Sequence, residues 1–130
     1  MKEYILVAGS RGFSDKKTME RVLSETFAAD MFFAEIVIVE GGAKGADLLA
    51  RDYAVKRGLE VIEFKPEWSK YGRAAGPKRN DMMVQFIREH GGKALYFWDG
   101  ESKGTKQCIE SAKKAGVQLT VWNTSENRYM

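Results

Sequence analysis

The chain is poor in the residue types that cross-link small proteins or bind metals. Its 130 residues include one cysteine, Cys108, and one histidine, His90. A single cysteine excludes an intrachain disulfide and fits a reducing compartment. No cluster of histidines, cysteines and carboxylates has the spacing of metal ligands, so we predict neither a metal nor a cofactor.

Long apolar runs and repetitive stretches are also missing. Residues 1–4 lead directly into an apolar strand, without the longer apolar run that a signal peptide needs. No stretch approaches the ~20 apolar residues of a membrane-spanning helix. We therefore expect a cytoplasmic protein without a membrane partner. Hydrophobic residues at 44% and charged residues at 30% indicate one ordinary globular domain over residues 1–130.

Strand and helix patterns alternate along the chain. Near-continuous apolar runs predict strands at 4–8, 36–39, 59–64, 94–98 and 117–122. Helical periodicity lies between them, with Asp15 placed to cap the first helix and Pro77 to open the third. Right-handed crossovers then give a doubly wound, Rossmann-like parallel sheet of about five strands flanked by helices. We prefer the strand order 3-2-1-4-5 and keep 2-1-3-4-5 as the alternative.

The net charge of +3 is small, but one segment concentrates positive charge. Residues 65–79 contain five lysines and arginines against a single acid, Glu67. Such a segment raises the local concentration of an anionic ligand, either a free nucleotide or a nucleic acid. A solvated surface loop explains the charge equally well. Trp68 and Tyr71, in the same segment, either stack on a base or cover the sheet edge.

Four glycine-containing segments follow predicted strands or precede predicted helices, at 9–15, 40–47, 76–81 and 99–105, and each contains a cation. Ligands of open α/β sheets bind at the carboxyl ends of the strands, where these segments should meet. Glycine allows close backbone approach, and the first-turn N–H groups of the following helices favour phosphate. No segment alone is specific, and 41–45 matches neither the P-loop nor the G-x-G-x-x-G fingerprint. The predicted ligand-binding residues are Gly9, Ser10, Arg11, Phe13, Gly41, Gly42, Lys44, Gly45, Asp47, Gly76, Pro77, Arg79, Asn80, Ser102, Gly104 and Thr105.

Three of these segments also resemble a family. Residues 7–13 (VAGSRGF), 39–47 (VEGGAKGAD) and 75–80 (AGPKRN) are similar to the YspA-like, YpsA-related branch of the SLOG superfamily, which is named for the Smf/DprA and LOG proteins. The resemblance covers nearly the whole chain. It implies a Rossmann-like fold, a nucleotide or an ADP-ribose-like or cyclic nucleotide derivative as ligand, and a homodimer or higher homo-oligomer. It also implies a link to phages or antiphage defence, where some SLOG domains sense nucleotide signals.

The sequence departs from the LOG pattern at one position. LOG proteins cleave the base from a nucleoside monophosphate and carry the motif P-G-G-x-G-T-x-x-E. Gly104 and Thr105 match it, but Cys108 stands where the glutamate would be. The residues themselves place Cys108 on the apolar face of a helix, which indicates a core position. The resemblance therefore favours binding without hydrolysis.

Three functional hypotheses remain. The preferred one is a protein that binds a nucleotide or its derivative, as a sensor or a sequestering protein. The second is a LOG-like phosphoribohydrolase or N-glycosidase that uses a displaced carboxylate, for which the candidates are Glu40, Asp47, Asp99 and Glu101. The third is a single-stranded nucleic-acid binder, as DprA proteins are. The small net charge and the lack of an aromatic stripe along a strand disfavour this third hypothesis.

Overall fold

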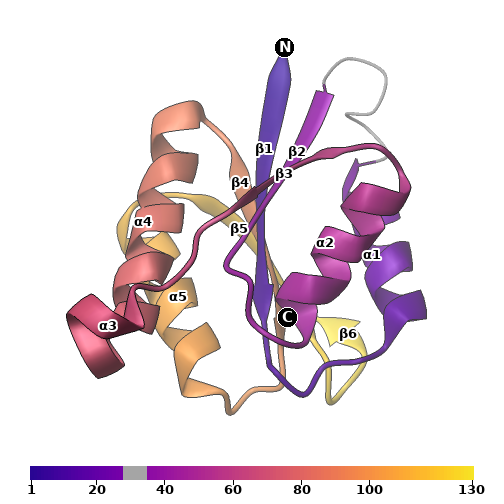
Figure 1. Cartoon of the computed structure of the whole chain (residues 1–130). Coiled ribbons are helices and arrows are strands. Elements are labelled where there is room, and N and C mark those ends of the chain that lie inside the picture. Colours follow the sequence, from indigo (N-terminus) through magenta and orange to yellow (C-terminus); the bar gives the residue numbers. More distant parts are fainter. Residues whose placement is uncertain (28–34) are drawn as a thin grey trace.

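Helices cover both faces of a central sheet in the computed structural model, which describes residues 1–27 and 35–130 (Figure 1). The strands are β1 (Lys2–Gly9), β2 (Glu35–Glu40), β3 (Glu60–Glu63), β4 (Lys93–Trp98), β5 (Gln118–Asn123) and β6 (Arg128–Tyr129). The helices are α1 (Lys16–Phe27), α2 (Ala46–Lys56), α3 (Trp68–Tyr71), the 3-10 turn η1 (Gly72–Ala74), α4 (Ala75–His90) and α5 (Lys103–Lys114).

The strand order is β3-β2-β1-β4-β5-β6, which confirms the preferred order 3-2-1-4-5 and shows that the alternative 2-1-3-4-5 is wrong. The first five strands pair in parallel, whereas β6 pairs antiparallel with the end of β5. The sheet thus has one strand more than expected. Two residues are too few to produce a periodic pattern, so the sequence carries no signal for β6.

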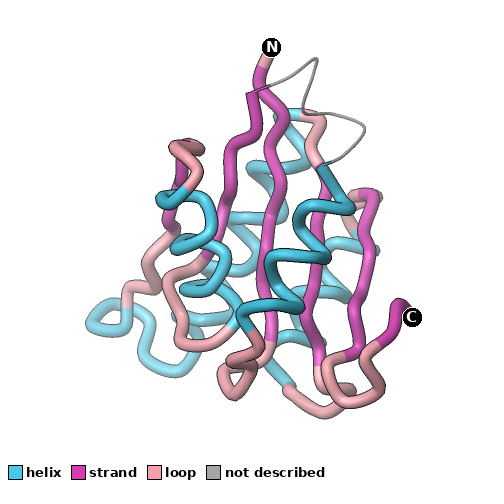
Figure 2. The backbone as a smooth tube through the Cα atoms, turned by 90° about the vertical axis from the view of Figure 1, so that its right-hand side faces the viewer, coloured by secondary structure: helices cyan, strands magenta, loops and turns pink. Residues whose placement is uncertain are grey.

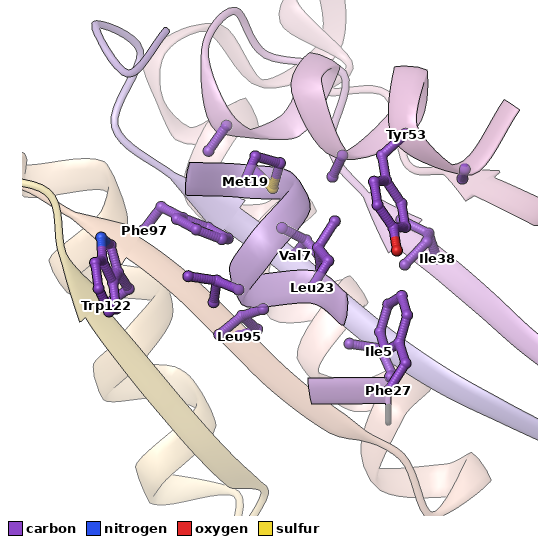
Figure 3. Close-up of a cluster of buried hydrophobic side chains, with 14 of the residues drawn as sticks. Ile5, Val7, Met19, Leu23, Phe27, Ile38, Tyr53, Leu95, Phe97 and Trp122 are labelled. Carbon is purple, nitrogen blue, oxygen red and sulfur yellow. The ribbon is translucent and has the colours of Figure 1, made fainter. Parts of the chain in front are cut away.

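Alternate residues of β1 supply the two halves of the core. Ile5 and Val7 face the layer of α1 and α2, while Leu6 and Ala8 face the layer of α4 and α5. Figure 3 shows the first half, in which Met19, Leu23 and Phe27 of α1 pack onto the sheet. In Figure 2 the helices lie in front of and behind the strands. Burial on both faces explains why these strands are almost continuously apolar.

The structure confirms one helix cap that the sequence predicted, and it shows that one predicted helix start is wrong. Asp15 caps α1 as expected, since the N–H of Thr18 donates to Asp15 Oδ1 at 3.1 Å and the Thr18 hydroxyl donates to Oδ2 at 2.7 Å. The start predicted at Pro77 is wrong, because α4 begins at Ala75. Pro77 is accommodated as the third helical residue, where a backbone N–H would have no acceptor within the helix. The preceding basic segment, expected as a loop, is helical from Trp68 to Ala74.

Candidate functional site

The carboxyl end of β1 approaches its neighbours so closely that only glycine fits. A Cβ added to Gly9 would lie 2.2 Å from the carbonyl oxygen of Phe97 and 2.8 Å from the Cβ of Ala46. The next residue, Ser10, donates its N–H to the same Phe97 oxygen at 2.9 Å. The first glycine-containing segment is therefore held between the ends of β1 and β4 and the start of α2.

All four glycine-containing segments border one cavity of about 480 Å³ at this edge of the sheet. Such a volume lies within the usual range for small-molecule sites. The 3-10 turn and α3 add a further wall. The cavity is lined by Ala8, Gly9, Arg11, Gly12, Ala43, Asp47, Trp68, Arg73, Gly76, Pro77, Arg79, Asn80, Ser102, Lys103, Gly104, Thr105 and Cys108.

The structure brings together ten of the sixteen predicted ligand-binding residues and leaves six outside the cavity lining. The ten are Gly9, Arg11, Asp47, Gly76, Pro77, Arg79, Asn80, Ser102, Gly104 and Thr105. The six are Ser10, Phe13, Gly41, Gly42, Lys44 and Gly45.

Two of those six, Phe13 and Ser10, make contacts that keep them from the cavity, and a third, Lys44, points away from it into solvent. Phe13 is buried and stacks on Phe97 with ring centroids 5.2 Å apart, so it belongs to the core. Ser10 is buried and accepts hydrogen bonds from the Asp99 N–H at 3.1 Å and the Ser102 hydroxyl at 3.0 Å. Ser10 therefore joins the β1 and β4 loops beneath the cavity. Lys44 is exposed and does not line it.

Some lining residues were not among the predicted ones. Three of them, Gly12, Ala43 and Lys103, lie inside the glycine-containing segments. The sequence pattern that predicted those segments therefore also pointed to these three residues. Arg73 lies in the basic segment. Cys108, expected in the core, is 1% exposed and also borders the cavity, while its sulfur lies 3.3 Å from the Tyr96 hydroxyl. Burial raises the pKa of the Cys108 thiol to about 12, so the thiol is neutral near pH 7.

Arg79 connects the second and third segments. The residue is only 9% exposed, and its Nη1 donates to the carbonyl oxygen of Gly41. A Cβ on Gly41 would lie 2.6–2.9 Å from the guanidinium atoms, so glycine is required for this contact. Arg79 Nε donates to Asn80 Oδ1 at 2.8 Å, and Asn80 Nδ2 donates to Gln107 Oε1 at 3.0 Å. This chain of hydrogen bonds fixes the guanidinium in the cavity wall.

Asp47 organises the turn after β2. Its Oδ2 accepts hydrogen bonds from the N–H groups of Gly41 at 3.1 Å and Ala43 at 3.3 Å. Burial raises the pKa of Asp47 to about 6, although these backbone hydrogen bonds and the charge of Arg79 oppose the shift. The buried carboxylate thus binds the N–H of Gly41, and the buried guanidinium binds its carbonyl oxygen.

A second acidic side chain, that of Glu40, lies beneath the same turn. Glu40 is fully buried, its Oε1 accepts a hydrogen bond from the Gly42 N–H at 2.7 Å, and it pairs in register with Glu63 on β3. Arg51 Nη1 lies 3.4 Å from Glu63 Oε1. Burial, reinforced by the neighbouring Glu63, raises the pKa of Glu40 to about 8.

This shift predicts a loss of stability as the pH rises. Between about pH 4.5 and 8 the unfolded chain releases the Glu40 proton while the folded chain keeps it, so the free energy of unfolding falls with pH. Glu40→Gln keeps an acceptor for Gly42 and removes this dependence. We expect the variant to be more stable than the parent at pH 8 by at least about 2 kcal/mol, since a pKa raised from 4.5 to about 8 corresponds to several times the ~1.4 kcal/mol of one pKa unit.

Urea unfolding at pH 5 and pH 8 measures the effect. Glu110→Gln, on the exposed surface of α5, serves as the matched control and should follow the parent at both pH values. A parent protein that is equally stable at pH 5 and pH 8 would contradict the raised pKa of Glu40.

Neither a metal cluster nor a membrane-spanning helix is found in the part of the chain that the structure describes. Within residues 1–27 and 35–130, no group of three or more histidine, cysteine, aspartate or glutamate side chains is placed to hold a metal ion. In the same ranges, no helix is long and apolar enough to cross a membrane.

The fold and the edge cavity define a Rossmann-like α/β domain, and the comparisons with known proteins place it in a family. Residues 4–71, just over half of the chain, match the model of the YspA, cpYpsA-related SLOG family. The Gene 61 protein of Mycobacterium phage D29 is 32% identical over 120 residues, which cover 88% of this chain and 92% of the phage protein. The chain therefore belongs to the YspA, cpYpsA-related SLOG family, as its motifs predicted.

Two solved structures share the fold. The DNA processing protein A (DprA) of Streptococcus pneumoniae superposes with a TM-score of 0.71 and 22% identity over 92% of this chain. This chain spans 50% of the length of that DprA chain. The protein TM1055 superposes with a TM-score of 0.59 and 17% identity, covering 90% of this chain and 72% of its own. At these identities the likeness concerns the fold.

Proposed function

We propose that this domain binds a nucleotide or a nucleotide-derived small molecule in the edge cavity, as a sensor or a sequestering protein. The observation that carries the proposal is the cavity itself, where glycine backbones and the first turn of α5 meet four cationic side chains. First-turn N–H groups have no partner within their helix and bind phosphate well. Membership of a SLOG family supports a nucleotide as ligand, and the relative in a mycobacteriophage supports a role in phage biology.

Binding without hydrolysis is the preferred form of this proposal. The side chain at position 108 is a neutral thiol, which neither activates water nor stabilises a developing positive charge. Of the displaced carboxylates considered, Glu40 is buried away from the cavity lining. Asp47 lines the cavity, but its Oδ2 already accepts two backbone hydrogen bonds. Asp99 accepts hydrogen bonds from the N–H groups of Glu101 and Ser102 through Oδ1.

Mass spectrometry of the small molecules released from the purified, denatured protein tests the proposal directly. An intact nucleotide or nucleotide derivative supports it. Incubation with nucleoside monophosphates is the companion measurement, because release of free base would favour the hydrolase instead.

A salt titration separates this proposal from nucleic-acid binding. A cavity neutralises one or two phosphates, so nucleotide affinity should depend weakly on salt. A single strand that contacts several phosphates should lose affinity with a logarithmic slope of about −0.7 per phosphate. We expect free nucleotides to displace any bound oligonucleotide completely. Tight, length-dependent binding of single strands that nucleotides cannot displace would contradict the proposal.

A further inference from the structure

The cavity has an aromatic and cationic wall that the glycine-containing segments do not supply. Trp68 of α3 and Arg73 of η1 both line it, and this part of the chain lies beside the start of α4 (Figure 1). Trp68 is 51% exposed, an unusual state for a residue with so large an apolar side chain. A Cβ on Gly76 would lie 3.7 Å from Trp68 Cη2, which places the edge of the ring against the first turn of α4. The indole is thus supported on one side and open to the cavity.

The four cations that line the cavity differ in how many contacts they already make with other residues of the chain. Arg79 is buried, bonded to Gly41 and Asn80, and its charge acts on the carboxylate of Asp47. Arg11, Arg73 and Lys103 are exposed, and none of the three forms an ion pair with another described residue. They come from three different segments, yet all border the same cavity. These three solvent-exposed cations are therefore available to an anionic ligand.

That charge exceeds what one phosphate supplies. A phosphate monoester carries about −1.5 to −2 near pH 7. The first turn of α5, with Lys103 and the nearby Arg11 loop, is the natural place for a terminal phosphate. A monophosphate bound there leaves Arg73 without an anionic partner, whereas a second phosphate provides one.

Building on the proposed function, we infer that the cavity selects a nucleotide with at least two linked phosphates, whose base stacks on Trp68 while Arg73 binds the phosphate nearer the base. The terminal phosphate then lies at the start of α5. Base stacking on an aromatic ring tolerates any base, so this arrangement specifies the phosphate number more strongly than the base.

Calorimetric titration of the intact chain with the mono- and diphosphates of all four common ribonucleosides, and with inorganic pyrophosphate, tests this arrangement. Diphosphates should bind at least about 10-fold more tightly than the matching monophosphates, the usual effect of one added charge-assisted contact. Arg73→Gln should remove this preference by weakening diphosphates and sparing monophosphates. Trp68→Ala should weaken nucleotides by about 10-fold and leave pyrophosphate unchanged.

Lys70→Gln is the matched control for the loss of charge. Lys70 lies in the same segment, 5.0 Å over the Tyr71 ring, and does not line the cavity. If Lys70→Gln and Arg73→Gln weaken diphosphates equally, the role assigned to Arg73 is wrong. Equal affinity of the parent for mono- and diphosphates overturns the inference and leaves the proposed function standing. If no nucleotide binds at all, the proposed function fails as well.

Discussion

Arg79→Ala should lose nucleotide affinity and stability together. Removing a charge-assisted contact to phosphate costs about 1.5–3 kcal/mol of binding free energy. The same substitution leaves Asp47 buried without its neighbouring cation and the Gly41 carbonyl without its donor. Leaving a buried acceptor without its donor costs about 1–3 kcal/mol of folding free energy. Calorimetric titration with a nucleotide, together with urea unfolding, measures the two effects.

Arg11→Ala separates the effect of a lost cation on nucleotide affinity from its effect on folding stability. Arg11 is exposed and lines the cavity, so its loss should weaken binding by a similar amount while leaving the free energy of unfolding nearly unchanged. Arg88→Ala, on the exposed end of α4 and outside the cavity, is the control for general charge effects. Unchanged affinity in both Arg79→Ala and Arg11→Ala would show that the ligand binds elsewhere.

Gly45→Ala should strongly lower the free energy of unfolding of the domain. Gly45 has a φ of +85°, and an added Cβ would lie 2.3 Å from the Ser10 carbonyl oxygen and 2.6 Å from that of Arg11. Both obstructing atoms belong to backbone, so neither can rotate away. We expect a loss of about 3 kcal/mol or more, which combines the cost of the left-handed conformation with that of the displaced loop.

Gly12→Ala provides a matched control for Gly45→Ala. Gly12 lies in the same loop cluster, has no positive φ and has no atom within 4 Å of the added Cβ. Its replacement should leave the urea midpoint almost unchanged. A Gly45→Ala protein within 1 kcal/mol of the parent, on the scale of an ordinary surface substitution, would contradict the steric argument.

The architecture followed from the sequence because the sheet is buried on both faces. Strands such as β2 have no exposed face that would interrupt an apolar run, and the helices between them show clear amphipathic faces. The sequence did not predict the short elements, because they lack a periodic apolar pattern. α3 and η1 lie in a polar, basic segment without apolar periodicity, and β6 consists of two residues.

The site was predictable only as far as topology governs it. Parallel strands end at one edge, so segments that follow β1, β2 and β4 had to meet there. The side on which each residue points is not fixed by this rule. Phe13 turns into the core onto Phe97, while Cys108 borders the cavity as well as the core. The inward turn of Arg79 depends on the glycine at position 41, a contact across 38 residues that no local pattern reveals.

The hydrogen bond between the hydroxyls of Ser10 and Ser102 joins positions 92 residues apart in the sequence. The loops around the cavity therefore come together only after the ribosome has made the segment that contains Ser102. The entropy lost on closing this long loop must be overcome before a ligand gains any contact. A ligand that binds only the finished cavity stabilises the native state by mass action, in proportion to the logarithm of its concentration. The amount of folded protein in a cell would thus rise with the ligand itself.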